Sequence, residues 1–283
     1  MNDDRETIGV IAGGGKFPFL VAEAARRQGY RTFAVAHGGE TDPLLAEVVD
    51  GVVWVRLGQL GRVIQALKAG GVQKVLMAGT IAKRRMFGRV RPDLKGLALM
   101  SKMAVFHDDG ILKAVSRELE KAGMSVISST EFLPELTAPE GVLTARRPSR
   151  QEMEDVRFGW TMAKELGRLD IGQCVVVRRK TVLAVEAVEG TDDAIRRGGG
   201  LAREKAVVVK VSKPGQDLRF DVPSVGSGTV EVMAGAGASV LAVEAGRTLI
   251  FDREAMIGRA DEAGISVVSL DLDPAPEKAG GRV

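Results

Sequence analysis

The chain has 283 residues, of which 45% are hydrophobic and 27% are charged, a composition typical of a folded globular protein. The only cysteine, Cys174, excludes an internal disulfide framework and a zinc site built from several thiolates, and with two histidines the metals most easily bound are oxygen-liganded ones. Forty basic and 37 acidic side chains with few aromatic residues argue against nucleic acid as a partner. The acidic N-terminus does not look like a signal peptide and no apolar run reaches the ~20 residues of a membrane span, so we expect a cytoplasmic protein.

The first 145 residues alternate short apolar runs with amphipathic stretches. Strands are predicted at residues 7–12, 30–36, 52–57, 72–78 and 124–128, and helices from near Pro18, at 60–68 and at 110–122. The apolar residues 97–106 favour a further core helix over a surface for acyl chains. Alternating strands and helices with short connections imply parallel pairing and right-handed crossovers. We therefore predict a doubly wound, Rossmann-like parallel-sheet domain over residues 1–145.

A stretch with prolines and arginines, residues 139–150, marks the predicted domain boundary. Beyond it we expect a helix at 151–169, strands at 173–179, 181–188, 207–212, 229–233, 239–243 and 248–252, and helices around 192–197 and 253–262. Closely spaced strands favour hairpins, so residues 146–283 are predicted to form a mixed α+β domain. The tail from Asp273 is rich in proline, glycine and charge and is expected to be disordered.

A glycine loop follows the first predicted strand and precedes the first helix. Backbone N–H groups at such a turn bind phosphate, so we predict phosphate or sugar contacts from Gly13, Gly14, Gly15 and Lys16. Neither standard motif matches, because Pro18 replaces the third glycine of the dinucleotide fingerprint and Phe17 replaces the Ser or Thr of a Walker A loop. The alternative is that the glycines only let the first helix pack close to the sheet.

Polar residues also follow the fourth predicted strand and precede the helix at 110–122. Gly79 and Thr80 leave the strand, and the basic run after them is either a solvated loop or a phosphate contact. This run comprises Lys83, Arg84, Arg85, Arg89 and Arg91. One aspartate of the pair before the helix is a natural N-cap, which leaves the second, Asp109, for a site.

The second half holds the denser groups of acidic residues. Residues 186–193 place four carboxylates where a strand turns into a helix, and Thr191 or Asp192 could cap that helix. Residues 213–223 place Asp217 and Asp221 on either side of Arg219, between two prolines. If this segment were extended, the two aspartates would lie roughly 13 Å apart. Either the loop therefore curls or only one of them is a ligand, and a structural Asp–Arg ion pair is the alternative.

At these residues the sequence resembles the LpxI family of UDP-2,3-diacylglucosamine pyrophosphatases of lipid A biosynthesis. The matching segments are IAGGGKFP up to Pro18, HDDGILKAV at residues 107–115, LDIGQCVVV around Gln173, AVEAVEGTDDAIRRGG at 184–199 and KPGQDLRFDVPSVG at 213–226. They occur in order across nearly the whole chain.

The resemblance implies hydrolysis of UDP-2,3-diacylglucosamine to UMP and 2,3-diacylglucosamine 1-phosphate (lipid X) with Mg²⁺, the ligand lying in the cleft between two domains. It implies Asp221 first and Asp217 second as catalytic residues and Mg²⁺ ligands, with Arg219 facing phosphate or pairing with an aspartate. The glycolipid nucleotide is expected to contact Gly13, Gly14, Gly15, Lys16, Gly79, Thr80, Asp109, Gln173, Glu186, Gly190, Thr191 and Asp192.

Two further expectations concern partners: peripheral contact with the inner face of the inner membrane, and a homodimer. Two other functions remain as alternatives. One is a non-catalytic protein that binds a nucleotide sugar or lipid. The other is a nucleotide-dependent oxidoreductase that uses the N-terminal half.

Overall fold

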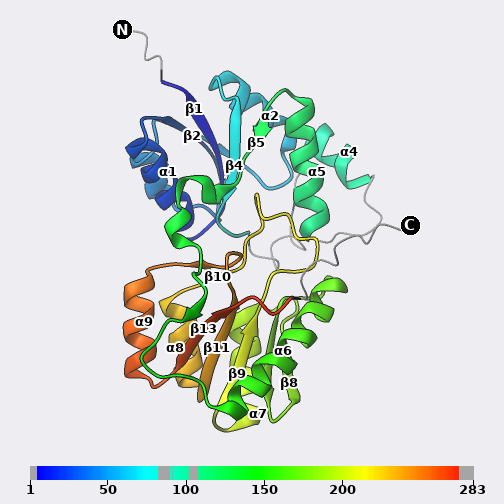
Figure 1. Ribbon diagram of the computed structural model, residues 1–283. Coiled ribbons are helices and arrows are strands. Elements are labelled where there is room, and N and C mark those ends of the chain that lie inside the picture. The colour runs from blue at the N-terminus through cyan, green and yellow to red at the C-terminus, as the bar shows by residue number, and fades with distance from the viewer. Residues whose placement is uncertain (1–4, 82–89, 91, 102–107, 274–283) are drawn as a thin grey trace, which may run out of the picture. The chain divides into compact units, whose positions relative to one another are not determined.

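The computed structural model describes residues 5–81, 90, 92–101 and 108–273, and the chain divides into two compact units (Figure 1). The first unit comprises Met1–Glu135 and Gln216–Val222, and the second comprises Leu136–Gly215 and Pro223–Val283. The border predicted at residue 145 thus falls inside the second unit, because residues 141–142 already pair with its sheet. The predicted basic run at 83–91 and the tail beyond Asp273 lie outside the described residues. No helix of the described part has the length and apolar character needed to cross a bilayer.

The first unit is built on a five-stranded, wholly parallel sheet with the order β3-β2-β1-β4-β5. Its strands are β1 (Thr7–Ala12), β2 (Arg31–His37), β3 (Gly51–Val55), β4 (Lys74–Ala78) and β5 (Ser125–Val126). This arrangement confirms the predicted doubly wound, Rossmann-like domain. The strand order reverses between β1 and β4, and sheets of this kind bind ligands beyond the carboxyl ends of the strands at that point.

Helices cover both faces of this sheet. They are α1 (Phe17–Arg27), α2 (Leu60–Ala69), α4 (Leu94–Ser101) and α5 (Asp108–Lys121), with short 3₁₀ turns η1 (Pro43–Glu47), η2 (Ser129–Phe132) and η3 (Pro134–Leu136). Leu67 of α2 and Leu119 of α5 are fully buried in one core cluster with Val75 of β4. Figure 1 shows α1 on the opposite side of the sheet from α2 and α5. Residues 102–106 of the helix predicted at 97–106 lie outside the described residues.

The second unit is built on a six-stranded mixed sheet with the order β6-β13-β11-β9-β7-β8. Its strands are β6 (Gly141–Val142), β7 (Cys174–Arg178), β8 (Thr181–Val185), β9 (Ala206–Lys210), β11 (Ala238–Glu244) and β13 (Ser266–Leu270). The hairpin between β7 and β8 is as predicted, whereas β9, β11 and β13 are parallel. A separate parallel pair is formed by β10 (Ser224–Val225) and β12 (Leu249–Ile250).

The strand predicted at residues 229–233 is wrong, because this segment lies in α8 (Ser227–Gly235). Its run of β-branched residues is too short for periodicity to separate a strand from a buried helix. Val230 and Met233 are both buried and lie three residues apart, which is the spacing of one helix face. The strand β13 is an element that the sequence analysis did not predict.

Three further helices complete a three-layered second unit: α6 (Arg150–Arg168), α7 (Thr191–Ala202) and α9 (Arg253–Glu262). On one face of the sheet, Val156 and Trp160 of α6 pack against strand valines such as Val209. On the other face, α7, α8 and α9 contribute Ile195, Met233 and Met256, which are fully buried.

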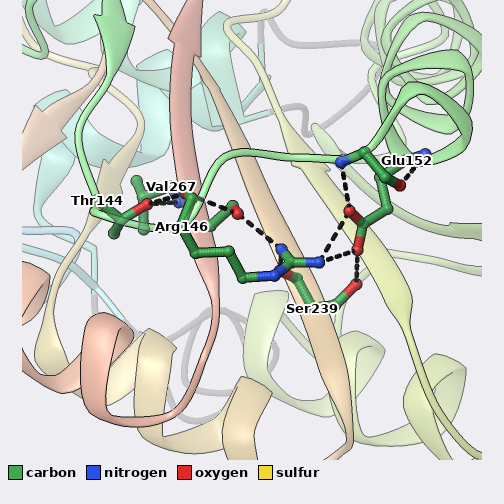
Figure 2. A network of polar contacts seen from close by, with 7 residues as sticks. Thr144, Arg146, Glu152, Ser239 and Val267 are labelled. Carbon is green, nitrogen blue, oxygen red and sulfur yellow. Dashed lines mark hydrogen bonds and ion pairs between the residues drawn. The ribbon is translucent and has the colours of Figure 1, made fainter.

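A polar network fastens the start of α6 to the sheet (Figure 2). The carboxylate of Glu152 accepts hydrogen bonds from Arg146 Nη2 at 2.6 Å, from the Ser149 N–H at 2.7 Å and from Ser239 Oγ at 2.7 Å. Arg146 Nη1 also donates to the Ser239 carbonyl at 3.0 Å and to Ser266 Oγ at 2.6 Å. Because Ser239 lies on β11 and Ser266 on β13, the network joins the chain before α6 to two strands of the sheet.

Candidate functional site

The loops after β1 and β4 are joined to each other at the point where the strand order reverses. The Gly13 N–H donates to the Ala78 carbonyl at 2.8 Å, and Gly14 and Thr80 exchange two backbone hydrogen bonds of 2.7 and 3.1 Å. A Cβ on Gly13 would lie 2.6 Å from the Thr80 carbonyl oxygen, and one on Gly79 would lie 2.5 Å from that of Gly14. Close packing therefore explains both glycines. Of the four residues predicted to contact phosphate, Gly13 and Gly14 already have partners for their backbone N–H groups.

Gly15 and Lys16 differ from the two glycines before them. Gly15 has a φ of +86°, and a Cβ added there would meet no other atom. Glycine is therefore favoured at this position by the backbone conformation and not by close packing. Lys16 is the N-cap residue of α1, and Pro18 in the first turn makes a helix start here favourable.

His37, at the end of β2, is a residue of this edge that sequence reasoning missed. Its Nδ1 lies 2.9 Å from the Ala12 carbonyl oxygen, which also accepts a hydrogen bond from Thr41 Oγ1 at 2.7 Å. Burial lowers the pKa of His37 more than the Ala12 carbonyl and Glu40 raise it. The ring is therefore neutral at pH 7 and, since a carbonyl only accepts, carries its proton on Nδ1 and leaves Nε2 as an acceptor.

The acidic segment Gln216–Val222 curls, which was one of the two arrangements predicted. The N–H groups of Phe220 and Asp221 both donate to the Asp217 carbonyl, at 3.3 and 3.1 Å. The segment is held to the first unit by the Ser129 N–H, which donates to the Arg219 carbonyl at 3.2 Å, and by an ion pair of 3.1 Å between Arg219 and Glu120 of α5.

Asp217 and Arg219 form the ion pair that the sequence analysis named as the alternative to a ligand role. Arg219 Nη2 lies 2.7 Å from Asp217 Oδ2, and Nε lies 3.0 Å from Oδ1. These hydrogen bonds lower the pKa of Asp217. The Asp217 carboxylate is thus already neutralised by a guanidinium, and its assignment as a metal ligand stays a prediction.

Asp221 lies in a different environment, because it lines a cavity of about 440 Å³ in the first unit. The same cavity is lined by Gly13, Gly79 and Thr80, so it brings four predicted site residues together, and by His37. No group of three or more His, Cys, Asp or Glu side chains gathers as a metal site within the residues described. Mg²⁺ commonly takes only one or two protein carboxylates and completes its octahedron with waters and substrate phosphates, and Asp221 fits that pattern.

Three predicted residues of the second unit meet around the carboxylate of Glu186. Glu186 Oε1 accepts from Thr191 Oγ1 at 2.8 Å, and Oε2 accepts from the Gln173 N–H at 3.3 Å. Gln173 Oε1 is buried and has no hydrogen-bond partner within the described part of the chain. Gly190, with a φ of +90°, is the N-cap of α7, so neither Thr191 nor Asp192 caps the helix as predicted.

Lys210, at the carboxyl end of β9, is a second residue that sequence reasoning missed. It lies opposite Cys174 in the sheet and is only 8% exposed. Its Nζ donates to the Ser224 carbonyl at 2.8 Å, and it makes no ion pair with any residue that the structure describes. Burial raises the pKa of the Cys174 thiol, which Glu186 raises further and Lys210 opposes. The sequence signal that could have identified it is a lysine at the end of an otherwise apolar strand, AVVVK.

The remaining predicted residues are placed only in part. Asp192 lies exposed in the first turn of α7. The backbone of Asp109 belongs to the first turn of α5, whereas its side chain and the basic run at 83–91 lie outside the described residues.

Comparisons with known proteins agree on one family. The model of the LpxI N-terminal domain matches residues 7–136, and that of the LpxI C-terminal domain matches residues 139–268. The UDP-2,3-diacylglucosamine pyrophosphatase LpxI of Caulobacter vibrioides is 37% identical over 281 residues, which cover 95% of this chain and 99% of that protein. These matches bear out the resemblance seen in the sequence.

Two of the similar solved structures are distant in sequence and fold. A Rhizobium etli pyruvate carboxylase is 13% identical with a TM-score of 0.29, over 47% of this chain and 12% of that one. An N5-carboxyaminoimidazole ribonucleotide synthetase is 18% identical with a TM-score of 0.28, over 61% and 32% of the two chains. TM-scores this low carry no argument about function. Both halves of the sequence match the two LpxI domain models in order, and the chain belongs to the LpxI family.

Proposed function

We propose that this chain hydrolyses the diphosphate bond of UDP-2,3-diacylglucosamine and releases UMP and 2,3-diacylglucosamine 1-phosphate. The observation that carries the proposal is the 37% identity, over 95% of the chain, with a protein named for that substrate. In the reaction, water adds to one phosphorus, the bond from that phosphorus to the bridging oxygen breaks, and the electron pair leaves with the other phosphate. No redox cofactor is needed.

Asp221 is the residue to which we assign the chemistry. Its position in the cavity beside His37 and Thr80 supports a role as the carboxylate that holds Mg²⁺ or accepts the proton of water. When bound, Mg²⁺ would neutralise charge that develops on the phosphoryl oxygens. Arg219 supplies a nearby cation, and its hydrogen bonds to Asp217 and Glu120 leave other N–H groups of the five that a guanidinium carries.

The second unit supplies the other proposed substrate contacts. Glu186 and Thr191 offer hydrogen-bonding oxygens to the nucleotide or sugar, and the orphaned Gln173 Oε1 is an acceptor without a partner among the described residues. The buried ammonium of Lys210 suits an anionic group, because a buried charge without a counterion is costly. Contact with a membrane surface and a homodimer remain predictions.

The test is UMP release from UDP-2,3-diacylglucosamine by the full chain, with and without EDTA. We expect Asp221→Asn to lower kcat by at least roughly a hundredfold, the lower end of what a positioned acid–base group contributes, and to keep substrate binding. The matched control is Asp193→Asn, an exposed aspartate that pairs with Arg196 and should keep full activity. Stoichiometric binding by wild type without UMP release would favour the non-catalytic carrier and would refute the proposal.

A further inference from the structure

Asp221 belongs to a short segment, Gln216–Val222, that is neither helix nor strand. The segment curls because the N–H groups of Phe220 and Asp221 both donate to the Asp217 carbonyl, at 3.3 and 3.1 Å. Both distances lie toward the long end of the range for N–H···O hydrogen bonds. Two long backbone bonds hold a turn only weakly, so the position of the Asp221 carboxylate depends on side chains around the turn.

The first of these side chains is the carboxylate of Asp217, which binds Arg219 within the same turn. Asp217 Oδ1 accepts from the Arg219 N–H at 3.2 Å and from Nε at 3.0 Å, and Oδ2 accepts from Nη2 at 2.7 Å. A carboxylate and a guanidinium joined by several hydrogen bonds fix each other's orientation. The shape of the turn therefore follows the place where the guanidinium of Arg219 is held.

The guanidinium is held from outside the segment by Glu120 of α5. Arg219 Nη1 lies 3.1 Å from Glu120 Oε1, which also accepts from Ser116 Oγ at 3.3 Å. Ser116 is buried and lies one turn earlier on the same helix, so it orients the glutamate. The guanidinium also lies over the ring of Phe220, 5.7 Å from its centroid, and this ring packs against the hydrophobic cluster of the first unit. A continuous set of contacts thus runs from α5 to the residue before Asp221.

We propose that Glu120 is a positioning residue, which holds Arg219, and through it Asp217, so that the turn presents the Asp221 carboxylate to the cavity. The inference rests on the proposed function, because that function gives Asp221 its chemistry. Glu120 itself does not line the cavity, so it acts through Arg219 and not by contact with a molecule bound there. A displacement of about 1 Å at a reacting group can lower a rate roughly a hundredfold, so small movements of the turn matter.

The ion pair between Glu120 and Arg219 is suited to this role and adds little to the stability of the fold. The two side chains are 44% and 42% exposed, and ion pairs at such exposure contribute little to stability because solvent screens them. Replacing Glu120 by glutamine should therefore leave the protein folded. Its effect should be confined to the segment that Arg219 holds.

The first test is steady-state UMP release from UDP-2,3-diacylglucosamine by Glu120→Gln. We expect kcat to fall roughly two- to fivefold, the effect of losing one half-exposed ion pair, and KM to stay at the wild-type value. The matched control is Glu118→Gln on the same helix, whose carboxylate pairs with Lys121 at 2.7 Å. It removes the same charge from α5 and should keep wild-type kcat and KM.

A double-mutant cycle with Arg219→Met decides whether Glu120 acts through Arg219. Residues that act through one contact give effects that do not add. In the Arg219→Met background, Glu120→Gln should therefore cause no further loss of kcat. If Glu120 instead acted on the substrate through its charge, the loss would persist in that background.

Hydrogen exchange without substrate gives a readout that does not depend on turnover. In Glu120→Gln, the amides of residues 216–222 should exchange roughly two- to fivefold faster, because loss of the ion pair favours local opening of the turn to the same degree. The rest of the first unit should exchange as in wild type. Glu118→Gln should leave exchange at 216–222 unchanged.

The outcomes separate this inference from the proposed function. No UMP release by wild type would refute the function, and exchange at 216–222 would then decide whether Glu120 holds the turn. With UMP release, the inference is overturned by an unchanged kcat in Glu120→Gln, by a raised KM, or by a loss that persists in the Arg219→Met background. If Arg219→Met does not fold by circular dichroism, unchanged exchange at 216–222 in Glu120→Gln overturns it.

Discussion

The ion pair between Arg146 and Glu152 gives the sharpest prediction about stability (Figure 2). In Glu152→Gln the neutral amide cannot accept all the bonds that Arg146, Ser149 and Ser239 now donate, and Arg146 loses its counter-charge. Removing one partner of a buried pair costs about 3–5 kcal/mol. Because the Arg146 side chain is 35% exposed and solvent screens part of its charge, we expect about 2–3 kcal/mol.

The assay is thermal unfolding followed by circular dichroism. At about 4 °C per kcal/mol for a unit of this size, Tm should fall by roughly 10 °C. The control is Glu165→Gln on the same helix, where the glutamate is 55% exposed and pairs with Arg168, and it should change stability by no more than about 0.5 kcal/mol. If Glu152→Gln lowers Tm no more than this control does, the network does not stabilise the second unit as we argue.

The pH dependence of the same difference has a defined sign. Burial acts to raise the pKa of Glu152, but hydrogen bonds from Ser239, Ser149 and Arg146 outweigh it, and the pKa lies below its ordinary 4.5. A carboxyl with a depressed folded-state pKa gives its full stabilisation above the unfolded value and loses it as the pH falls through the folded value. The Tm difference between wild type and Glu152→Gln should therefore be constant at neutral pH and shrink below pH 4.5.

Three further predictions concern single residues elsewhere in the chain. Gly200→Ala should stabilise by about 0.5–1 kcal/mol, because the site on α7 is open, whereas Gly199→Ala should destabilise by about 1–3 kcal/mol, because its Cβ would meet the Ala236 carbonyl; urea unfolding of the pair measures both. Since burial lowers the pKa of His37 below 6.5, wild type should lose stability as the pH falls from 6.5 toward the folded-state pKa, and a pH series in which His37→Gln shows the same slope would contradict this. Cys174 is buried with a raised pKa, so a thiol reagent should label it only in denaturant, and rapid labelling of the native chain would show that β7 opens.

The strands and main helices of the first unit could be predicted because short local signals in the sequence mark them. Strand β1 is a continuous apolar run, and Pro18 marks the first turn of α1. In the second unit the residues of α8 carry β-branched side chains over a single short segment, and their helical state follows from packing against β11 and α9. The periodicity of so short a run does not distinguish a strand from a buried helix, so the state of this segment depends on its tertiary contacts.

The sequence predicted which types of residue line the candidate site, but not which residues each of them contacts. Asp221 lines the cavity of the first unit, whereas the carboxylate of Asp217 pairs with Arg219, and only the family resemblance ranked Asp221 before Asp217. Both aspartates lie two residues from Arg219 in the sequence, so the position of the arginine does not distinguish them. His37 was missed because its role depends on the Ala12 carbonyl of a neighbouring strand, a contact that only the folded sheet creates.

The short segment Gln216–Val222 makes the first unit discontinuous in sequence, so no single cut in the gene separates the two units. It is encoded within the second half of the gene but contributes Phe220 to the hydrophobic cluster of the first unit and Asp221 to its cavity. A fragment ending at residue 135 would keep all five parallel strands and still lack that acid. Splitting the gene at its apparent midpoint would therefore separate Asp221 from the cavity that it lines.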